Sequence, residues 1–124
     1  MAFQQDWIMR QIEMIIQFLA RLLYGSDSVA YEEYLDEEHI TSDALFRAVN
    51  ERLQQGRISD AEDLLFDQMN PSNPYELQVA IDFYERLNDL SDDELEQGDF
   101  SREEVEEGLR DVIHQFGVEL PQNF

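Results

Sequence analysis

Helix start signals recur along this 124-residue chain and restrict its fold more than any other feature. A helix can begin with Asn73, Pro74 and Glu76, which supply a cap, a proline at the first helical position and an early acid. Thr41 or Ser42 is the expected cap of an earlier helix. Three further starts have the spacing of a capping box, in which a serine oxygen accepts a free amide hydrogen and a glutamate reaches back. These pairs are Ser59–Glu62, Ser91–Glu94 and Ser101–Glu104.

Apolar residues recur every three or four positions, as they do in helices that bury one face. No run alternates convincingly with the period of two that a strand would need. We therefore predict an all-α fold in which a single domain over residues 1–124 packs five or six helices in one bundle and ends in a flexible tail over about 118–124. The predicted helices span 5–24, 42–55, 60–69, 74–90, 92–97 and 102–116. Residues 26–40 remain open between irregular structure and a short helix.

The first predicted helix has more apolar surface than a helix on the outside of a domain needs. Its polar side chains are gathered in one narrow stripe around Arg10 and Gln17, and most of the remaining circumference is apolar. Either this helix runs through the middle of the bundle, or a second copy of the chain covers part of it. We expect a homo-oligomer whose seam contains apolar residues of this helix. The expected seam residues are Ile8, Ile12, Ile15, Leu19 and Leu22.

The centre of the chain, residues 45–71, resembles one tetratricopeptide-type helix pair. Gly56 ends the first helix, Ala61 stands where that family packs a small residue, and Leu65 fills a later apolar position. The resemblance implies a helical hairpin held by these three residues. Val49 occupies a position where a small residue is typical, and the proline that closes the unit comes about two residues early. Because arrays need about three units, no groove residue for a peptide carries over.

A second local similarity relates LQQGRIS, residues 53–59, to LEQGDFS, residues 95–101. Both stretches place a helix-ending glycine two residues before an apolar residue and a capping serine. Convergence on common helix–loop–helix chemistry explains this similarity better than a true repeat does.

Over most of its length the chain resembles a group of small acidic helical proteins of unknown function from anaerobic Gram-positive bacteria. The resemblance lies in FQQDWIMRQIEMIIQFLARLLYG, AEDLLF and FYERLNDLSDDELEQGDFSREEVEEGLRDV. It implies a helical fold, and it supplies no activity, cofactor or site residue.

Charge excludes several classes of partner. The chain has 29 acidic residues against 8 basic ones, all arginine, and a net charge of -21. Direct binding to nucleic acid is not expected, because phosphate contacts need lysine and arginine, and anionic membranes are disfavoured for the same reason. Gln17 and Arg21 interrupt the N-terminal apolar run, which argues against a membrane span. Cysteine is absent, which excludes disulfides and thiolate metal sites and fits the cytoplasm.

No catalytic constellation is recognisable in the sequence. It has no glycine-rich phosphate loop, no lysine for a Schiff base, and no spacing that pairs a nucleophile with a base. We therefore expect neither enzymatic activity nor a cofactor.

Two patterns resemble metal sites, and neither is specific. Asp36–His39 and Asp111–His114 have the spacing of the carboxylate–histidine pairs in di-iron bundles, but those pairs use glutamate, and acids are frequent here. Residues 93–104 have the length of a calcium loop, but leucine and glutamine stand where oxygen ligands are wanted at the third and fifth positions. We expect no metal site.

The sequence thus favours a non-enzymatic protein-interaction module or a self-associating adaptor with a protein partner. The alternative is an acidic decoy, whose rows of carboxylates imitate phosphates and occupy the nucleic-acid site of a basic protein.

Overall fold

A computed structural model describes residues 2–124, with side chains from Asp6 onward. It confirms the predicted all-α class, since the described residues form helices and no strand. The helices are α1 (Ala2–Tyr24), α2 (Ile40–Gln54), α3 (Ile58–Gln68), α4 (Pro74–Asp89), α5 (Asp92–Gln97) and α6 (Arg102–Gln115), with a short 3-10 helix η1 (Glu37–His39) before α2.

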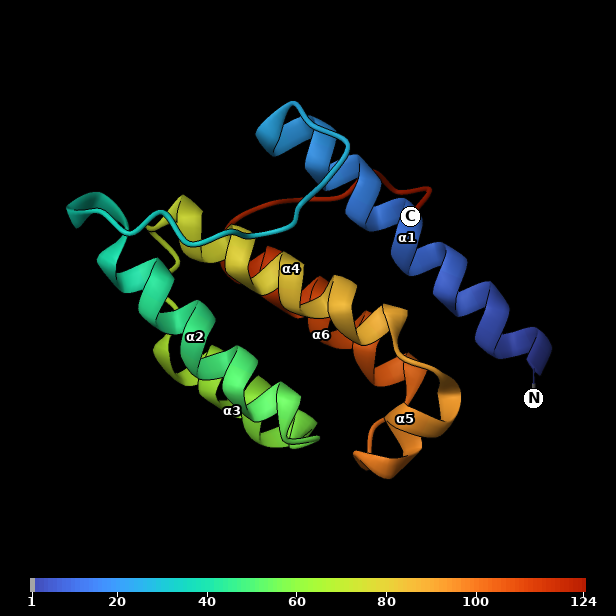
Figure 1. The fold of residues 1–124 in the computed structure, drawn as a ribbon. Helices are drawn as coiled ribbons and strands as arrows, with labels where there is room; N and C mark the ends of the chain where they lie inside the picture. The colour runs from blue at the N-terminus through green and yellow to red at the C-terminus, as the bar shows by residue number, and fades with distance from the viewer. Residues whose placement is uncertain (1) are drawn as a thin grey trace.

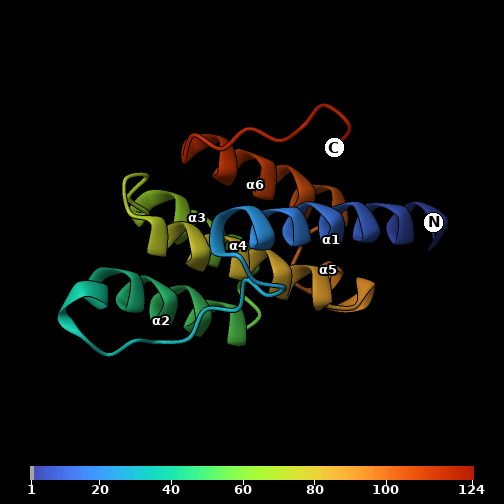
Figure 2. The ribbon, with the colours of Figure 1, turned by 90° about the horizontal axis from the view of Figure 1, so that it is seen from above.

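Helix α4 occupies the centre of the bundle and packs against α1, α2 and α6 (Figure 1). Helix α3 pairs with α2 as a hairpin, α6 also contacts α1, and the short α5 connects the end of α4 to the start of α6. Helix α1 lies on one side of the bundle (Figure 1), and the view from above shows it over α4, between α6 and α2 (Figure 2). Of the two places that the sequence allows for α1, the structure therefore excludes the middle of the bundle.

Two of the three predicted capping boxes are present. Ser91 and Ser101 each accept a hydrogen bond from the amide of the glutamate three residues later, and each glutamate carboxylate accepts the serine amide in return. Asn73 caps α4 by accepting from the Tyr75 amide, with Pro74 at the first helical position. These three starts confirm the sequence prediction, because each depends only on contacts within one turn of the chain.

The box predicted at Ser59 is wrong. Helix α3 begins two residues earlier than predicted, at Ile58, and no side chain caps it. Glu62, the expected partner, instead accepts a hydrogen bond of 2.7 Å from the Tyr84 hydroxyl of α4. Tertiary packing explains the change, since burial of Ile58 and Ala61 fixes where the helix begins.

The start of α2 also differs from the prediction. Asp36 caps η1 by accepting from the His39 amide at 3.1 Å, and the chain continues directly into α2 at Ile40. Neither Thr41 nor Ser42 is a cap; Ser42 is buried, and its hydroxyl donates to the carbonyl of His39. Residues 26–36 carry no helix, so the ambiguous stretch is irregular up to η1.

The core is continuous through the bundle, and α1 contributes a full face to it. The expected seam residues Ile8, Ile12, Ile15 and Leu19 are all buried within this single chain. Their assignment to a contact between copies is therefore corrected, because α4 and α6 pack against α1 and the chain's own core covers these four side chains. The fifth, Leu22, remains 57% exposed.

The segment after α6, where we expect a flexible tail over about 118–124, has no helix or strand and folds back onto the bundle. Gly117, with a φ of 78°, lets the chain reverse at the end of α6. The ring of Phe124 then packs on Phe18 of α1 at 5.1 Å between centroids, and Arg110 donates to the main-chain oxygen of Phe124 at 2.6 Å. Val118, Leu120 and Phe124 of this segment are partly buried against the core.

The two similar stretches at residues 53–59 and 95–101 are not equivalent in structure. Gly56 has the left-handed conformation after α2, whereas after α5 it is Asp99, and not Gly98, that has a positive φ. Gly98 is needed for another reason: a Cβ there would lie 2.5 Å from the Cδ1 of Ile58. This one-residue offset supports convergence.

Candidate functional site

A line of exposed apolar side chains runs along α1 and is the most unusual surface of the molecule. Trp7 is 65% exposed, Met14 54% and Leu22 57%, and Phe18 is partly buried between them. Spacings of seven and four residues place all four on one side of a helix. We call Trp7, Met14, Phe18 and Leu22 the α1 ridge.

A pocket of about 510 Å³ opens on this ridge near the end of α1. Its walls combine ridge residues, two polar side chains of α1 and the aromatic ring that the C-terminal segment brings back. The lining residues are Met14, Gln17, Phe18, Arg21, Leu22 and Phe124. An apolar pocket beside protruding apolar side chains is typical of a surface that anchors a partner's aromatic residue.

The α1 ridge lies on a helix with no net charge. The four charged side chains of α1, Asp6, Arg10, Glu13 and Arg21, cancel one another, so the net charge of -21 resides on the other elements. The acids are densest at residues 32–38, where five carboxylates fall within seven positions. An acidic partner that approaches α1 therefore meets less electrostatic repulsion than it would at residues 32–38.

Sequence reasoning identified the excess apolar surface of α1 but not the side on which it stays exposed. Only Leu22 of the five expected seam residues belongs to the α1 ridge. Trp7, Met14 and Phe18 were missed, because core and ridge are both apolar and adjoin around the helix. The neighbouring helices, and not the periodicity, determine which part is covered.

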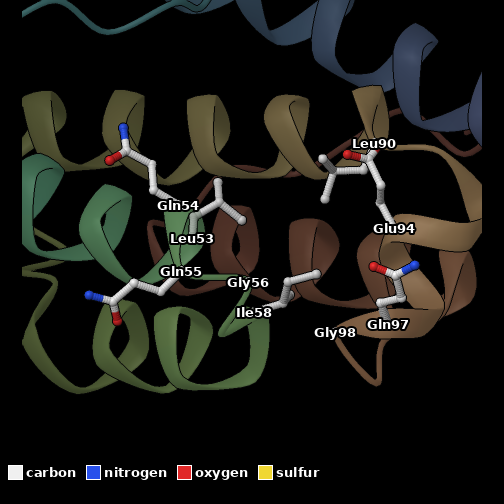
Figure 3. Close-up of a pocket in the computed structure, with 9 residues that line it drawn as sticks. All are labelled: Leu53, Gln54, Gln55, Gly56, Ile58, Leu90, Glu94, Gln97 and Gly98. Carbon is white, nitrogen blue, oxygen red and sulfur yellow. The ribbon is translucent and has the colours of Figure 1, made fainter.

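A second pocket, of about 400 Å³, lies between the α2–α3 turn and α5 (Figure 3). Three of its nine lining residues have apolar side chains, and three are glutamines, namely Gln54, Gln55 and Gln97. Glu94 is the pocket's carboxylate, and hydrogen bonds from Ser91 lower its pKa while committing it to the cap of α5. The pocket can accept hydrogen-bonding groups such as peptide amides, but it carries no free acid or base for chemistry.

The three residues expected to hold the hairpin lie in two environments. Ala61 and Leu65 are fully buried on α3, while Gly56 is exposed in the turn with a φ of 75°. Helices α2 and α3 pack closely against each other. The hairpin itself is thus present, and its likeness to a tetratricopeptide unit remains a resemblance.

Two buried carboxylates tether residues 28–36, which we call the strap. Asp43 of α2 accepts hydrogen bonds from the Tyr31 hydroxyl at 2.6 Å and from the amides of Tyr34 and Leu35 at 3.2 and 2.8 Å. Asp82 of α4 accepts from the Tyr31 amide at 3.1 Å. Leu35, 78% exposed, has a φ of 61°, a conformation that costs a leucine free energy and that these bonds hold in place.

The two tethering carboxylates have opposite pKa shifts. Burial raises the pKa of Asp43, but the hydrogen bonds from Tyr31, Leu35 and Tyr34 outweigh it and leave the pKa below its ordinary value. Burial dominates at Asp82 and raises its pKa, in spite of the Tyr31 amide and Arg86. Burial and the bond to Asp43 raise the pKa of the Tyr31 hydroxyl, which therefore stays protonated and donates.

The two carboxylate–histidine pairs are separate in space and in role. His39 is buried, stacks on Tyr34 at 3.7 Å, and places Nδ1 2.6 Å from Asp36, whereas His114 is exposed on α6. Within residues 2–124, no group of three or more His, Asp and Glu side chains is arranged to hold a metal ion.

None of the helices within residues 2–124 has the length and apolarity needed to cross a bilayer.

Comparison with known proteins places the chain in a family. Residues 2–117 match the family described as "Family of unknown function (DUF6483)", and the chain belongs to this family. Comparisons with curated proteins and with solved structures found no match.

Proposed function

We propose that this protein is a non-enzymatic interaction module, a self-associating adaptor in the cytoplasm, which binds a protein partner through the α1 ridge. One observation carries the proposal: a line of exposed apolar side chains runs along a helix whose own charges cancel, on a molecule with a net charge of -21. Exposed apolar patches rimmed by polar residues mark protein-binding surfaces. The sequence adds support, because it lacks the recognisable parts of an active site.

Affinity capture from the native cells tests this proposal. The bait is the wild-type chain or the double variant Met14→Glu/Leu22→Glu, which places two charges on the ridge. Both sites are exposed, so the variant should keep its fold, which circular dichroism checks. A partner held by apolar contact should stay bound when salt rises to about 0.5 M, because screening weakens only the charged contacts. The double variant should lose it.

The matched control is Leu35→Glu, which replaces an exposed leucine outside α1 by the same acid. It should capture the partner as well as wild type does. A partner that the double variant binds at wild-type strength would contradict the proposal.

An acidic decoy is the second candidate, and the charge favours it. Five carboxylates at residues 32–38 flank the exposed side chains of Tyr34 and Leu35, so a basic protein would find both charge and apolar contact there. In the same capture, a decoy should release its partner at about 0.5 M salt and be unaffected by the ridge variant. Replacing the acids of residues 32–38 by amides should then abolish capture.

A further inference from the structure

We propose that the occupant of the α1 ridge is the α1 ridge of a second copy of this chain, with the two helices antiparallel about a twofold axis near Met14. This inference rests on the proposed function, because it names the partner of the same surface. It is carried by the distribution of charge, the order of side chains along α1 and the pocket beside Phe18.

Charge restricts where two copies can meet. Two chains of net charge -21 repel each other, and the repulsion is strongest where acidic surfaces would face, as at residues 32–38. In α1 and in α2, two acids and two arginines cancel. Of these two helices, α1 has the line of exposed apolar side chains, so a contact between copies along α1 combines low repulsion with apolar burial.

The order of charges along α1 selects the antiparallel arrangement. In a parallel pair, Arg10 would face Arg10 and Arg21 would face Arg21, which is unfavourable. In an antiparallel pair centred on Met14, Trp7 lies beside Arg21 of the second copy, and Asp6 lies within reach of the same guanidinium. Arg21 can then form a cation–π contact with the indole and an ion pair with the carboxylate.

The α1 ridge also contains both a protruding side chain and a pocket that can receive it. Trp7 protrudes near the beginning of the ridge, and the pocket of about 510 Å³ lies around Phe18 near its end. Rotation about an axis near Met14 brings Trp7 of each copy over the pocket of the other. Because a twofold contact is self-complementary, one surface supplies both pairs. Tryptophan in a pocket is a frequent hot spot of protein interfaces.

The contact has the size that a dimer needs. The ridge from Trp7 to Leu22 is about 22 Å long at 1.5 Å per residue, with neighbouring side chains on both sides. Two such helices, two buried indoles and the ring of Phe124 bring the buried surface to the order of 1,000 Å², the lower end for specific interfaces. The dimer is thus expected to be concentration-dependent.

Light scattering tests the association itself. Wild type should approach twice the 14.7 kDa chain mass as concentration rises, and more readily in about 0.5 M salt, which screens the repulsion. Met14→Glu puts two like charges at the axis and should weaken association by about 100-fold or more. Leu35→Glu, with the same change of chemistry off α1, should associate as wild type does. A wild type that stays monomeric throughout would overturn the proposal.

Trp7 is the one tryptophan of the chain and reports its own burial. Its emission should shift to the blue as wild type associates and stay unshifted in Met14→Glu. Association without a shift would overturn the ridge as the interface.

Cysteine cross-linking tests the orientation in a chain that has no cysteine of its own. Met14→Cys should form a disulfide with itself across the axis. Trp7→Cys should cross-link with Arg21→Cys in a mixture, and much less with itself. Self-linking of Trp7→Cys in preference to the mixed pair would show a parallel dimer and overturn the proposal. If no dimer forms, the capture experiment still tests whether the α1 ridge binds another protein. Failure of the dimer and failure of the proposed function therefore give different results.

Discussion

At the scale of single residues, Gly108 shows how tertiary contact reverses an expectation from helix propensity. It lies inside α6, where alanine is about 1 kcal/mol more favourable than glycine. A Cβ at this position, however, would lie 2.5 Å from both the Tyr84 hydroxyl and a Glu62 oxygen. Tyr84 is fully buried, so its ring cannot move aside. The glycine is required by the close approach of α4 and α6.

Gly108→Ala is therefore expected to destabilise the protein by about 1–2 kcal/mol, since the cost of overpacking exceeds the gain in propensity. Denaturant unfolding measures the change. Glu107→Ala, at the exposed neighbouring position, should stay within about 0.5 kcal/mol of wild type. A Gly108→Ala variant more stable than wild type would show that α4 and α6 do not approach this closely.

Ala61 gives a second residue-scale prediction. It is fully buried on α3, where the hairpin packs, and a carboxylate there would be buried without a partner. Ala61→Glu should lower the free energy of unfolding by about 2 kcal/mol or more. Ser59→Glu adds the same charge at an exposed position in the first turn of α3 and should be nearly neutral. Equal melting temperatures for Ala61→Glu and wild type would place Ala61 on the surface.

At the scale of elements, the strap is held to α2 and α4 by hydrogen bonds to side chains and not by the backbone hydrogen bonds of a helix or a sheet. Its irregular backbone satisfies the amides of Tyr31, Tyr34 and Leu35 with the carboxylates of Asp82 and Asp43. Because buried backbone groups need partners, these two acids replace the hydrogen bonds that regular structure would provide. The strap should therefore open before the helices do.

Tyr31→Phe tests this arrangement by removing the hydroxyl that bonds Asp43. We expect faster amide hydrogen exchange at Tyr34 and Leu35, with little change in the helices, and a loss of stability of about 1–2 kcal/mol. Tyr75→Phe is the matched control, because its hydroxyl makes only a long bond of 3.3 Å to the exposed Glu38. Unchanged exchange in Tyr31→Phe would show that the strap does not depend on Asp43.

At the scale of the whole molecule, uncompensated acidity determines how stability responds to solution conditions. Six of the arginines in the described chain form ion pairs with carboxylates, which leaves most of the 29 acidic side chains without a cationic partner there. Like charges are closer together in the folded chain than in the unfolded one. Their repulsion opposes folding, and salt reduces it.

Stability should rise as pH falls from 7 toward about 5. Burial raises the pKa values of Glu62, Asp82 and Glu85 in the folded chain, and nearby acids add to the shift at Glu62 and Glu85. A carboxyl whose pKa is higher in the folded state binds protons more readily when folded, so protonation favours folding. Below about pH 4 the trend should reverse, since Asp43 and Glu94 have lowered pKa values and their stabilisation is lost as they become protonated.

Denaturant titrations at pH 7, 5.5 and 3.5, each at low and high salt, measure both effects. Higher salt should increase stability most at pH 7, where the charge is greatest. Glu62→Gln should reduce the rise between pH 7 and 5.5, because it removes one of the raised carboxyls while its amide oxygen can still accept from Tyr84. Greatest stability at pH 7 and indifference to salt would show that the charges are locally compensated.

Features that depend on neighbours along the chain can be predicted from the sequence. The helical class, the caps at Asn73, Ser91 and Ser101, and the hairpin turn at Gly56 follow from contacts within a few residues, and periodicity alone shows the excess apolar surface of α1. Ser59 was misassigned because a capping box in sequence cannot show that Glu62 has a better partner in α4.

Which apolar surface is core and which is exposed depends on long-range packing. Burial depends on which helices meet, so the position of α4 against α1 separates the core residue Ile12 from the ridge residue Met14. The same cause buries Arg102, a residue type that is usually exposed, because the carbonyls of Asn88 and Leu90 at the end of α4 need its donors. Local spacing in the sequence does not reveal long-range contacts. The candidate site consists of the apolar side chains of α1 that those contacts leave exposed.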